Sequence, residues 1–479
     1  MKEDAGSKKV TTVRFSADGI RGIAGQWPMN RLGAWRIGTV IREYVLQRAE
    51  QATVFLGRDT RPSGAMLSDA LVAGLSCDTI TVIDLGIMTT PGIAYLTKKH
   101  KANLGVIVTA SHNPPKYNGV KLLDSDGFRL PRDEEEKIED LIANVSSKQP
   151  RMVTRALAPA DATDLLNEYV ADQIKWSGLS GRPITKLVVD CANGAPARVV
   201  PEVFRILGTA TQFVNIGQDG AQIGRGSGSE YVRSEPHRFA RQVRDTDSDY
   251  GLAFDGDGDR LLIVDRDGRT YDGIDILFVL AKYFHSKQLL KGAAIVTSDS
   301  ANRGLDDSLR EHGIATIRTD NGDRNIEQVI RNQQLLLGGE SVGNIIINDS
   351  HHGSADPLLA ALWLIRIIEE GARPGLELQQ LVSDYTKYPQ FLASGVLADL
   401  PDLETLPRFE DEKQRCHAQL GEGAREKIWY SSTEPGRLNV MVEGGAATDY
   451  DAVHDAALRL YQFVENAVRS EQRSSAATS

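Results

Sequence analysis

Short apolar runs, each ended by a polar or glycine-containing turn, recur along the chain. Each run is followed by a helical pattern and then by a second apolar run; the pairs of runs lie at residues 54–56 and 80–84, 187–189 and 210–215, and 294–296 and 315–318. Strands that alternate with helices in this way predict parallel strands joined by helical crossovers. Because the pattern occurs three times, it predicts three related α/β domains.

Charged and turn-rich stretches between these units predict the domain boundaries. Residues 132–150 are typical of a charged helix that closes the first unit, and residues 371–375 of a linker. Beyond the linker the alternation stops until a final helix over residues 450–470. We therefore expect α/β domains over residues 1–153, 154–265 and 266–372, a smaller α+β domain over 376–468, and a disordered tail over 469–479.

One predicted strand ends in an unusual polar segment. The apolar residues 106–108 are followed by the letters TASHN and then by two prolines. Because proline can neither donate to a sheet ladder nor sit inside a helix, the strand must end before it. The hydroxyl of Ser111 is therefore expected at the carboxyl end of a strand, where open α/β sheets bind their ligands. A polar turn without a function is the alternative interpretation of these residues alone.

A second segment places Asp255, Asp257 and Asp259 between two apolar runs, with glycines between the aspartates. Residues two apart in an extended backbone share a face, so the three carboxylates are expected on one side of a tight loop. A cation relieves their repulsion, and hard divalent ions such as Mg²⁺ prefer oxygen ligands. An EF-hand is excluded, because Arg260 and Arg266 stand where its loop needs glycine and glutamate. A phosphatase with Asp255 as its nucleophile remains an alternative.

Ser111 and the aspartate loop together suggest phosphoryl transfer. A serine is a weak nucleophile without an activating base, and no base triad is evident in the sequence. A phosphorylated serine needs no such activation. Its phosphate can be a further oxygen ligand of Mg²⁺, and the metal then neutralises charge as the phosphoryl group leaves. The predicted metal site is therefore Ser111 with the three aspartates.

Composition and charge narrow the function classes. The formal net charge of −10 argues against a general nucleic-acid binder. No apolar run has the length of a membrane span, and the first residues lack the apolar segment of a secretory signal. The three cysteines are far apart and odd in number, which fits a reducing compartment. We therefore expect a cytoplasmic protein, a monomer or a homodimer, with no nucleic-acid or membrane partner.

These motifs resemble those of a known family, the α-D-phosphohexomutases. Residues 109–114 resemble its phosphoserine loop and residues 255–260 its metal loop. The other matching segments are residues 18–22 (amino-terminal active-site loop), 338–344 (sugar-binding loop) and 431–435 (phosphate-binding loop). The resemblance extends over about residues 15–468. The segments DGIRG and GRDTR look most like the phosphoglucosamine mutase branch.

The resemblance implies four domains around a central cleft, the first three being α/β domains with mixed sheets. It implies a phosphosugar substrate and a ping-pong exchange between hexose 6-phosphate and hexose 1-phosphate. Hexose 1,6-bisphosphate would be the intermediate and activator, Mg²⁺ the cofactor, and glucosamine phosphate the substrate. Glucose or mannose phosphates, or a catalytically impaired phosphosugar-binding relative, remain alternatives.

The resemblance also implies residue roles. Ser111 would carry the phosphoryl group, and the three aspartates would bind Mg²⁺. Lys121 and Arg21 would assist the movement of charge and protons, Arg260 would steady the metal loop or the phosphoserine, and His112 is a further catalytic candidate. The substrate-binding candidates are Glu340, which would accept hydrogen bonds from sugar hydroxyls, and Val342, Asn344, Asp323, Arg324, Ser431, Ser432, Thr433 and Arg437.

Two recognition loops depart from the family's pattern. In the sugar loop, Val342 and Asn344 stand where the family has serine and histidine, so a hydroxyl and an imidazole are lost. In the phosphate loop, Trp429 stands where the family has arginine, and Ser432 where it has a glycine that permits close backbone approach. The candidates for the missing positive charge are Arg425, Lys427 and Arg437.

Overall fold

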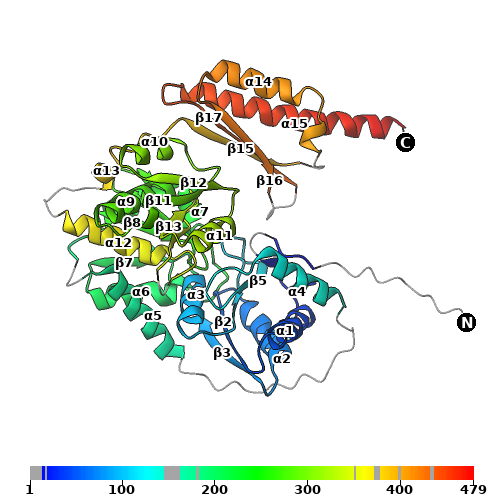
Figure 1. The fold of residues 1–479 in the computed structure, drawn as a ribbon, viewed down its shortest axis with the longest axis vertical. Helices are drawn as coiled ribbons and strands as arrows, with labels where there is room; N and C mark the ends of the chain where they lie inside the picture. The colour runs from blue at the N-terminus through cyan, green and yellow to red at the C-terminus, as the bar shows by residue number, and fades with distance from the viewer. Residues whose placement is uncertain are drawn as a thin grey trace, which may run out of the picture.

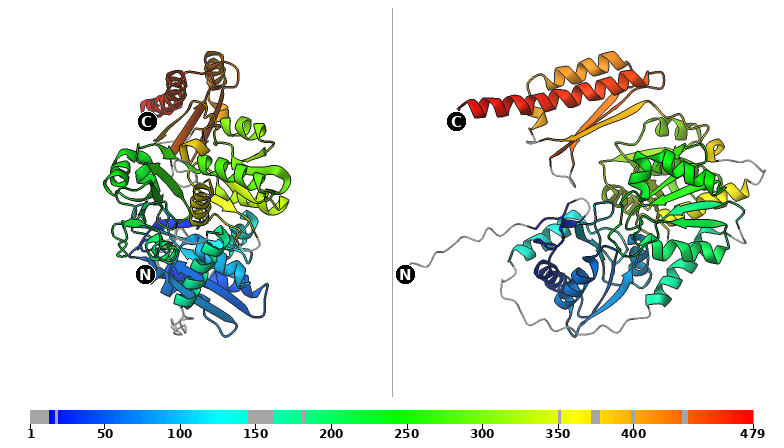
Figure 2. Two further views of the ribbon diagram at one scale, coloured as in Figure 1. Left: turned by 90° about the vertical axis from the view of Figure 1, so that its left-hand side faces the viewer. Right: turned by 180° about the vertical axis from the view of Figure 1, so that it is seen from behind.

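The computed structural model describes residues 13–16, 19–144, 162–179, 183–349, 352–371, 378–397, 401–431 and 436–478. Figures 1 and 2 show four domains arranged in an arc, with the first and the last domain at its two ends. Three of them are α/β domains with mixed sheets, and the fourth is smaller, which confirms the predicted fold class.

The first domain is built on a five-stranded sheet with the order β1-β5-β4-β2-β3. Its strands are β1 (Ile20–Ile23), β2 (Ala52–Arg58), β3 (Ile80–Ile87), β4 (Leu104–Val108) and β5 (Tyr117–Leu123), and its helices are α1 (Arg31–Leu46), α2 (Gly64–Leu75), α3 (Thr90–Lys99) and α4 (Arg132–Asn144). β2 is parallel to β3 and β4, and β5 runs antiparallel to β4. Val106 and Val108 pack with α1, α2 and α4, whereas Ile107 packs with α3, so helices cover both faces of the sheet.

The second domain repeats this plan, with the strand order β10-β9-β8-β6-β7. Its elements are α5 (Ala162–Ser177), β6 (Leu187–Asp190), α6 (Pro196–Leu207), β7 (Thr211–Val214), α7 (Gly228–Ser234), α8 (Pro236–Asp245), β8 (Tyr250–Phe254), β9 (Leu261–Asp265) and β10 (Thr270–Tyr271). β6 is parallel to β7 and β8, and β8 forms an antiparallel hairpin with β9. The three aspartates lie in the loop of this hairpin, between two buried strands.

The third domain has a four-stranded sheet with the order β12-β11-β13-β14. Its elements are α9 (Gly273–Ser286), the 3₁₀ turn η1 (Lys291–Ala293), β11 (Ala294–Ser298), α10 (Gly304–Glu311), β12 (Ala315–Thr319), α11 (Asp323–Gln333), β13 (Leu337–Gly339), β14 (Ile345–Ile347), α12 (Pro357–Glu370) and α13 (Leu378–Leu381). β11 is parallel to β12 and β13. A parallel pair of strands joined by a helix thus occurs in each of the three sheets, as the repeated sequence pattern predicts.

The C-terminal domain is a three-stranded antiparallel sheet, β15-β17-β16, with helices on one face (Figure 1). Its elements are β15 (Gln390–Val396), the 3₁₀ turn η2 (Leu403–Thr405), α14 (Phe409–Leu420), β16 (Arg425–Tyr430), β17 (Arg437–Glu443) and α15 (Tyr450–Thr478). The prediction of a disordered tail over residues 469–479 is wrong for the described part, because α15 continues to Thr478. No glycine or proline interrupts this segment, so nothing in it ends the helix.

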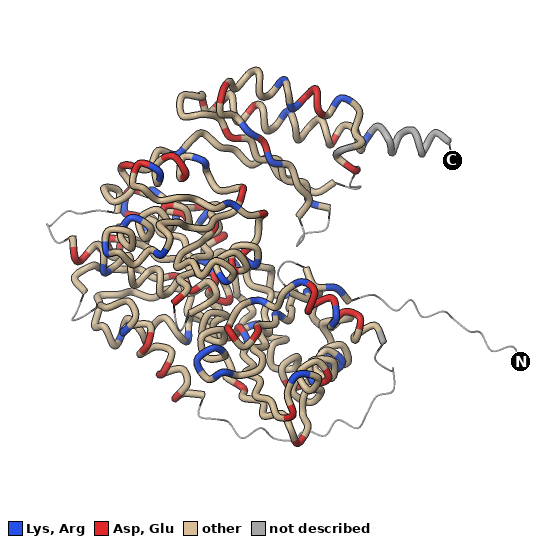
Figure 3. The backbone as a smooth tube through the Cα atoms, viewed as in Figure 1, with Lys and Arg blue, Asp and Glu red and all other residues tan. Residues whose placement is uncertain are grey.

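Charges are spread over the whole molecule. Figure 3 shows acidic and basic residues interspersed along all four domains. The charge around any one site is therefore set by its local groups rather than by a large surface of one sign. Within the described residues, every helix is too short or too polar to span a bilayer.

A buried charged cluster joins the first and third domains. The amide of Arg129 donates to Oε2 of Glu327 at 3.0 Å, and Nη2 of Arg324 lies 2.6 Å from Oε1 of Glu135 on α4. Glu327 is 2% exposed, and its other carboxylate oxygen has no hydrogen-bond partner among the described residues. Burial, followed by the negative charge of Asp323, raises the pKa of Glu327 to about 8 from its ordinary value of 4.5.

We expect Glu327→Gln to make the protein more heat-stable at alkaline pH. The carboxyl group of Glu327 releases its proton near pH 4.5 in the unfolded chain but only near pH 8 in the folded protein. The wild type therefore loses stability as the pH rises between these values. Glutamine cannot ionise and still accepts a hydrogen bond from Arg129. The Tm of the variant should exceed that of the wild type by about a few degrees at pH 9, with a smaller gap at pH 5. The exposed Glu311→Gln is the control, and a gap that does not depend on pH would contradict the raised pKa.

Candidate active site

Ser111 lies just beyond β4 and is held in an uncommon backbone conformation. Its φ is 49°, in the left-handed region, and it is 1% exposed. The hydroxyl donates to Oδ2 of Asp255 at 2.6 Å and lies 3.2 Å from Nδ1 of His112. A non-glycine residue in this region persists only where its surroundings hold it there. The structure thus directs the Ser111 hydroxyl at the aspartate loop of the second domain.

Arg61 and Asp59, which follow β2, hold the serine loop in place. Nη2 of Arg61 donates to the carbonyl oxygens of Ser111 and Asn113, both at 2.7 Å, while Nε is paired with Asp59 at 2.9 Å. Oδ2 of Asp59 also accepts a hydrogen bond from the hydroxyl of Thr109 at 2.6 Å, and Oδ1 accepts one from the amide of Arg61 at 2.9 Å. Both members of the ion pair are fully buried. Sequence reasoning found the segment but missed this supporting role, because the contacts join residues about fifty positions apart.

The aspartate loop is folded around one carboxylate oxygen. Oδ1 of Asp255 accepts hydrogen bonds from the amides of Gly258 and Asp259 at 3.0 Å and of Arg260 at 3.2 Å. Gly258 has a φ of 77°, which favours glycine, and a Cβ at Gly256 would lie 2.6 Å from the carbonyl oxygen of Ser111. The glycines thus allow the tight turn and the close approach of the two loops.

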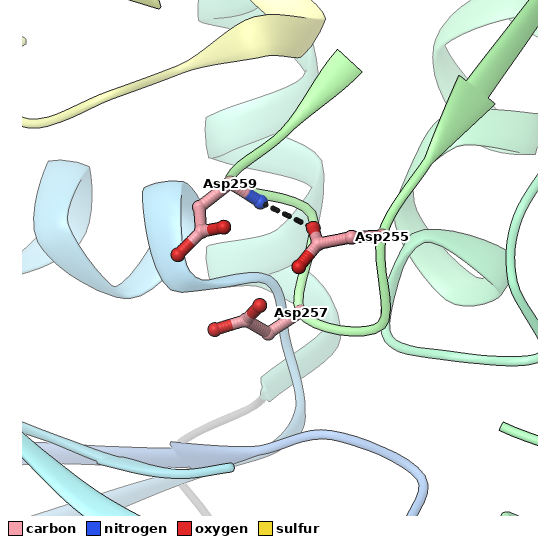
Figure 4. A group of neighbouring side chains, drawn as sticks. All are labelled: Asp255, Asp257 and Asp259. Carbon is pink, nitrogen blue, oxygen red and sulfur yellow. Dashed lines mark hydrogen bonds between the residues drawn. The ribbon is translucent and has the colours of Figure 1, made fainter. Parts of the chain in front are cut away.

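The three carboxylates converge as the sequence predicts. Figure 4 shows the side chains of Asp255, Asp257 and Asp259 pointing toward one another, and one ligand atom from each lies within 4.8 Å of the others. All three are buried, and Oδ1 of Asp257 and Oδ1 of Asp259 have no hydrogen-bond partner among the described residues. Buried carboxylate oxygens without donors fit a hard divalent cation. The residues present can therefore hold a magnesium ion.

Lys121 on β5 supplies the positive charge next to these carboxylates. Its Nζ lies 2.9 Å from Oδ2 of both Asp257 and Asp259, and the hydroxyl of Thr90 donates to Asp257 at 2.7 Å. Burial tends to raise the pKa of Asp257, but the charge and hydrogen bond of Lys121 outweigh it, so that pKa is lowered. Burial and the neighbouring carboxylates raise the pKa of Asp255 and of Asp259. The cluster thus has one ammonium for three carboxyl groups.

Two arginines flank the serine and aspartate loops. Nη1 of Arg21 on β1 donates to Oδ1 of Asn113 at 3.1 Å. Nη1 of Arg260 lies 3.2 Å from Oε1 of Glu230 on α7. Burial opposes ionisation of Glu230, but the charges of Arg260 and Arg233 outweigh it and lower the pKa of Glu230. Glu230 thus holds Arg260 beside the loop, a role that no pattern in the sequence signals.

A cavity of about 550 Å³ opens next to this cluster, between the four domains. Its lining includes His112 from the first domain, Asp259 and Arg260 from the second, and Glu340 and Val342 from the third. The C-terminal domain adds Gln390, Leu392, Lys427, Trp429, Tyr430, Ser431 and Met441. The central cleft that the resemblance implies is therefore present. His112, Asp259 and Arg260 bring the serine and aspartate loops to its wall, whereas Ser111, Asp255 and Asp257 lie behind these lining residues and are buried.

The structure brings some substrate-binding candidates into the cleft and leaves others outside it. Glu340, Val342, Asn344, Asp323 and Ser431 line the cavity. Oε1 of Glu340 accepts from the amide of Gly322 at 2.8 Å, and the Asn344 side chain donates to the carbonyl oxygen of Asp259 at 2.7 Å. Asn344 thus couples the sugar loop to the aspartate loop.

Two of the described candidates, Arg324 and Arg437, do not line the cavity. Arg324 is directed at Glu135 in the contact between the first and third domains. Nη1 of Arg437 donates to the hydroxyl of Ser394 at 3.1 Å, on the C-terminal sheet. Ser432 and Thr433 lie outside the described residues. Predictions for these residues came from loop positions, which do not fix the direction of a long side chain.

Three domain families match the chain along most of its length. They are described as phosphoglucomutase/phosphomannomutase alpha/beta/alpha domains I, II and III, and match residues 12–149, 163–268 and 272–388.

Similar proteins and structures extend this match. The phosphoglucosamine mutase of Staphylococcus epidermidis is 36% identical over 447 residues, which are 91% of this chain and 95% of that protein. The phosphoglucosamine mutase of Pelotomaculum thermopropionicum is 36% identical over 439 residues, 90% of this chain and 95% of that protein. A phosphoglucomutase/phosphomannomutase family protein of Burkholderia thailandensis has a similar fold, with a TM-score of 0.76 and 22% identity over 95% of this chain and 97% of that one. A putative phosphomannomutase of Thermus thermophilus gives a TM-score of 0.70 at 20% identity, over 94% and 99% of the two chains.

The sequence matches cover all three α/β domains and, through the full-length relatives, most of the chain. The chain therefore belongs to the α-D-phosphohexomutase family, within which it resembles the phosphoglucosamine mutases.

Proposed function

We propose that the protein interconverts glucosamine 6-phosphate and glucosamine 1-phosphate through a phosphorylated Ser111. The observation that carries this proposal is the hydroxyl of Ser111 at 2.6 Å from the buried Asp255, next to His112 and Asp259, which line a cavity large enough for a phosphosugar. The relatives named phosphoglucosamine mutase support the choice of sugar.

In the proposed reaction, phospho-Ser111 gives its phosphoryl group to the free hydroxyl of the hexose monophosphate. The bond from Oγ to phosphorus breaks as a bond from the sugar oxygen forms, which gives hexose 1,6-bisphosphate, and the proton of the sugar hydroxyl ends on Oγ of Ser111. The bisphosphate then reverses its orientation in the cleft. The bond from its other phosphorus to the sugar oxygen breaks as a bond to Oγ of Ser111 forms, and the proton of Oγ passes to that sugar oxygen. The bisphosphate is thus both intermediate and activator.

The proposed roles of the surrounding residues follow from charge and position. Arg260 at the cavity wall stabilises negative charge on the phosphoryl oxygens, and Lys121 and Arg21 assist at the reacting oxygens. Magnesium held by the three aspartates and by Ser111 would neutralise charge on the group in transfer. Glu340 accepts hydrogen bonds from sugar hydroxyls, with Val342, Asp323 and the C-terminal side chains around it.

A phosphatase with Asp255 as nucleophile is a weaker candidate. Oδ1 of Asp255 already accepts three amide hydrogen bonds, and Oδ2 accepts the hydroxyl of Ser111. The three amide bonds occupy Oδ1, so only one lone pair of Oδ2, beside the Ser111 hydroxyl, is left to attack phosphorus or to bind a metal.

We further propose domain boundaries near residues 153, 265 and 372, and a cytoplasmic protein that acts as a monomer or a homodimer.

The proposal is tested by ³¹P NMR of the purified protein with Mg²⁺ and a trace of hexose bisphosphate. The 6-phosphates of glucosamine, glucose and mannose are supplied separately. We expect a growing 1-phosphate signal, fastest with glucosamine 6-phosphate. Release of inorganic phosphate instead would favour the phosphatase, and no change with any sugar, in protein that carries phosphate on Ser111, would contradict a mutase for these substrates.

A further inference from the structure

The uncovered face of the C-terminal sheet forms one wall of the cleft. Helices α14 and α15 cover the other face. Residues two apart on β16 share a face, so Arg425, Lys427 and Trp429 are all on the cleft side. Lys427 is paired with Met441 of β17, and Met441 with Leu392 of β15. Lys427 thus stands in an apolar row that lines the cavity.

Of the three basic residues that the sequence offers for the phosphate, Arg425 is committed to another contact. Its Nε lies 2.8 Å from Oε1 of the buried Glu443, and its Nη2 donates to the carbonyl oxygen of Ala301 at 2.6 Å. Arg425 therefore joins the C-terminal domain to the third domain. Arg437 lies on β17 and does not line the cavity.

Lys427 lines the cavity and has partners that an anion can replace. Its Nζ lies 3.2 Å from Oδ2 of Asp299 and 3.6 Å from Oδ1 of Asp320. The side chain of Asp320 is 87% exposed and that of Lys427 is 22% exposed. Ion pairs with exposed carboxylates are weak, whereas a phosphate dianion carries more charge and more acceptor oxygens.

We propose that Lys427 binds the substrate phosphate that is not being transferred to or from Ser111. Before the substrate binds, the ammonium of Lys427 is paired with Asp299 and Asp320, and this phosphate then displaces their carboxylates. This role rests on the proposed function and adds the identity of the cation. Among the described residues that line the cavity, Arg260 and Lys427 are the two permanent cations, one beside the aspartate loop and the other on the C-terminal sheet. A hexose bisphosphate needs a positive partner at each of its two phosphates. Leu392, Met441 and Trp429 line the cavity around Lys427 and make its surroundings less polar, which strengthens its attraction for an anion.

The test compares Lys427→Met, Lys427→Arg and Asp320→Asn with the wild type. The KM for glucosamine 6-phosphate and the Kd of glucosamine 1-phosphate, measured by calorimetry, should both rise about 10- to 100-fold in Lys427→Met. Lys427→Arg should restore most of the affinity. Asp320→Asn should lower the KM about two- to fivefold, because it removes a competitor of the phosphate. The matched control is Lys413→Met, since Lys413 is also an ion-paired lysine of this domain and has a similar exposure of 26%.

The opposite effects of Lys427→Met and Asp320→Asn separate phosphate binding from a structural bridge between domains. If both variants weaken binding, Lys427 is a bridge and the assignment is wrong. If the wild type converts glucosamine 6-phosphate, and the KM and Kd of Lys427→Met lie within twofold of the wild-type values, the assignment is wrong while the proposed function stands. If the wild type binds glucosamine 1-phosphate but does not turn it over, the proposed function fails, and the calorimetric comparison still decides the role of Lys427.

Discussion

Ser111→Ala is expected to lower mutase turnover by about 10⁴-fold or more, which is a loss of about 5 kcal/mol of transition-state stabilisation. In the proposed reaction, Oγ of Ser111 is bonded to phosphorus at the start and at the end of each catalytic cycle, so no part of the cycle proceeds without it. Alanine removes only this hydroxyl. Arg61 holds the loop through the backbone carbonyl of residue 111, so the loop should keep its place. Steady-state turnover of glucosamine 6-phosphate, with bisphosphate in excess, measures the effect.

A second readout locates the phosphate independently of turnover. Incubation with hexose bisphosphate should add one phosphoryl group to the wild type, seen by intact-protein mass spectrometry, and none to Ser111→Ala. Ser286→Ala, at an exposed helix end, is the control and should be phosphorylated and active like the wild type. Turnover in Ser111→Ala above about a tenth of the wild-type rate would show that another group carries the phosphoryl.

Local sequence signals predicted the parts of the site that depend on neighbouring residues. β4 ends at Val108, before the TASHN segment and the prolines that follow it, and the alternation of aspartate and glycine folds the metal loop, so both loops are where the sequence places them. The three strand–helix–strand units followed from hydrophobic patterning, because burial of each strand on both faces leaves an apolar run.

Contacts between distant parts of the chain could not be predicted in this way. Arg61 reaches Ser111 across fifty residues, and Arg324 turns toward Glu135 of another domain rather than into the cleft. The sequence likewise left three basic residues as equal candidates for the substrate phosphate. Only the register of β16 and β17 and the partners of Arg425 distinguish them. The helical end of α15 was missed because its polar composition is equally typical of a disordered segment.

Removal of the metal is expected to abolish turnover, and Asp257→Asn to lower it about 10³-fold. In the structure Lys121 offers one positive charge to three buried carboxyl groups, and two of their oxygens have no donor among the described residues. A divalent cation satisfies both needs, so chelation with EDTA should stop the reaction and added Mg²⁺ should restore it. In Asp257→Asn a neutral amide replaces one carboxylate, which weakens any metal bound by the loop. Lys121 keeps Asp259 at 2.9 Å, so the variant should still fold.

Thermal stability separates metal binding from catalysis. Only the folded protein has the site for Mg²⁺, so Mg²⁺ should raise the Tm of the wild type and of the control Asp267→Asn, which changes an exposed residue. It should raise the Tm of Asp257→Asn much less. This measurement needs no substrate and does not depend on which sugar the protein uses. An equal rise in all three proteins would place the metal elsewhere. An inactive Asp257→Asn with a full Mg²⁺ response would mean that Asp257 serves the reaction through Lys121, its partner at 2.9 Å, rather than through the metal.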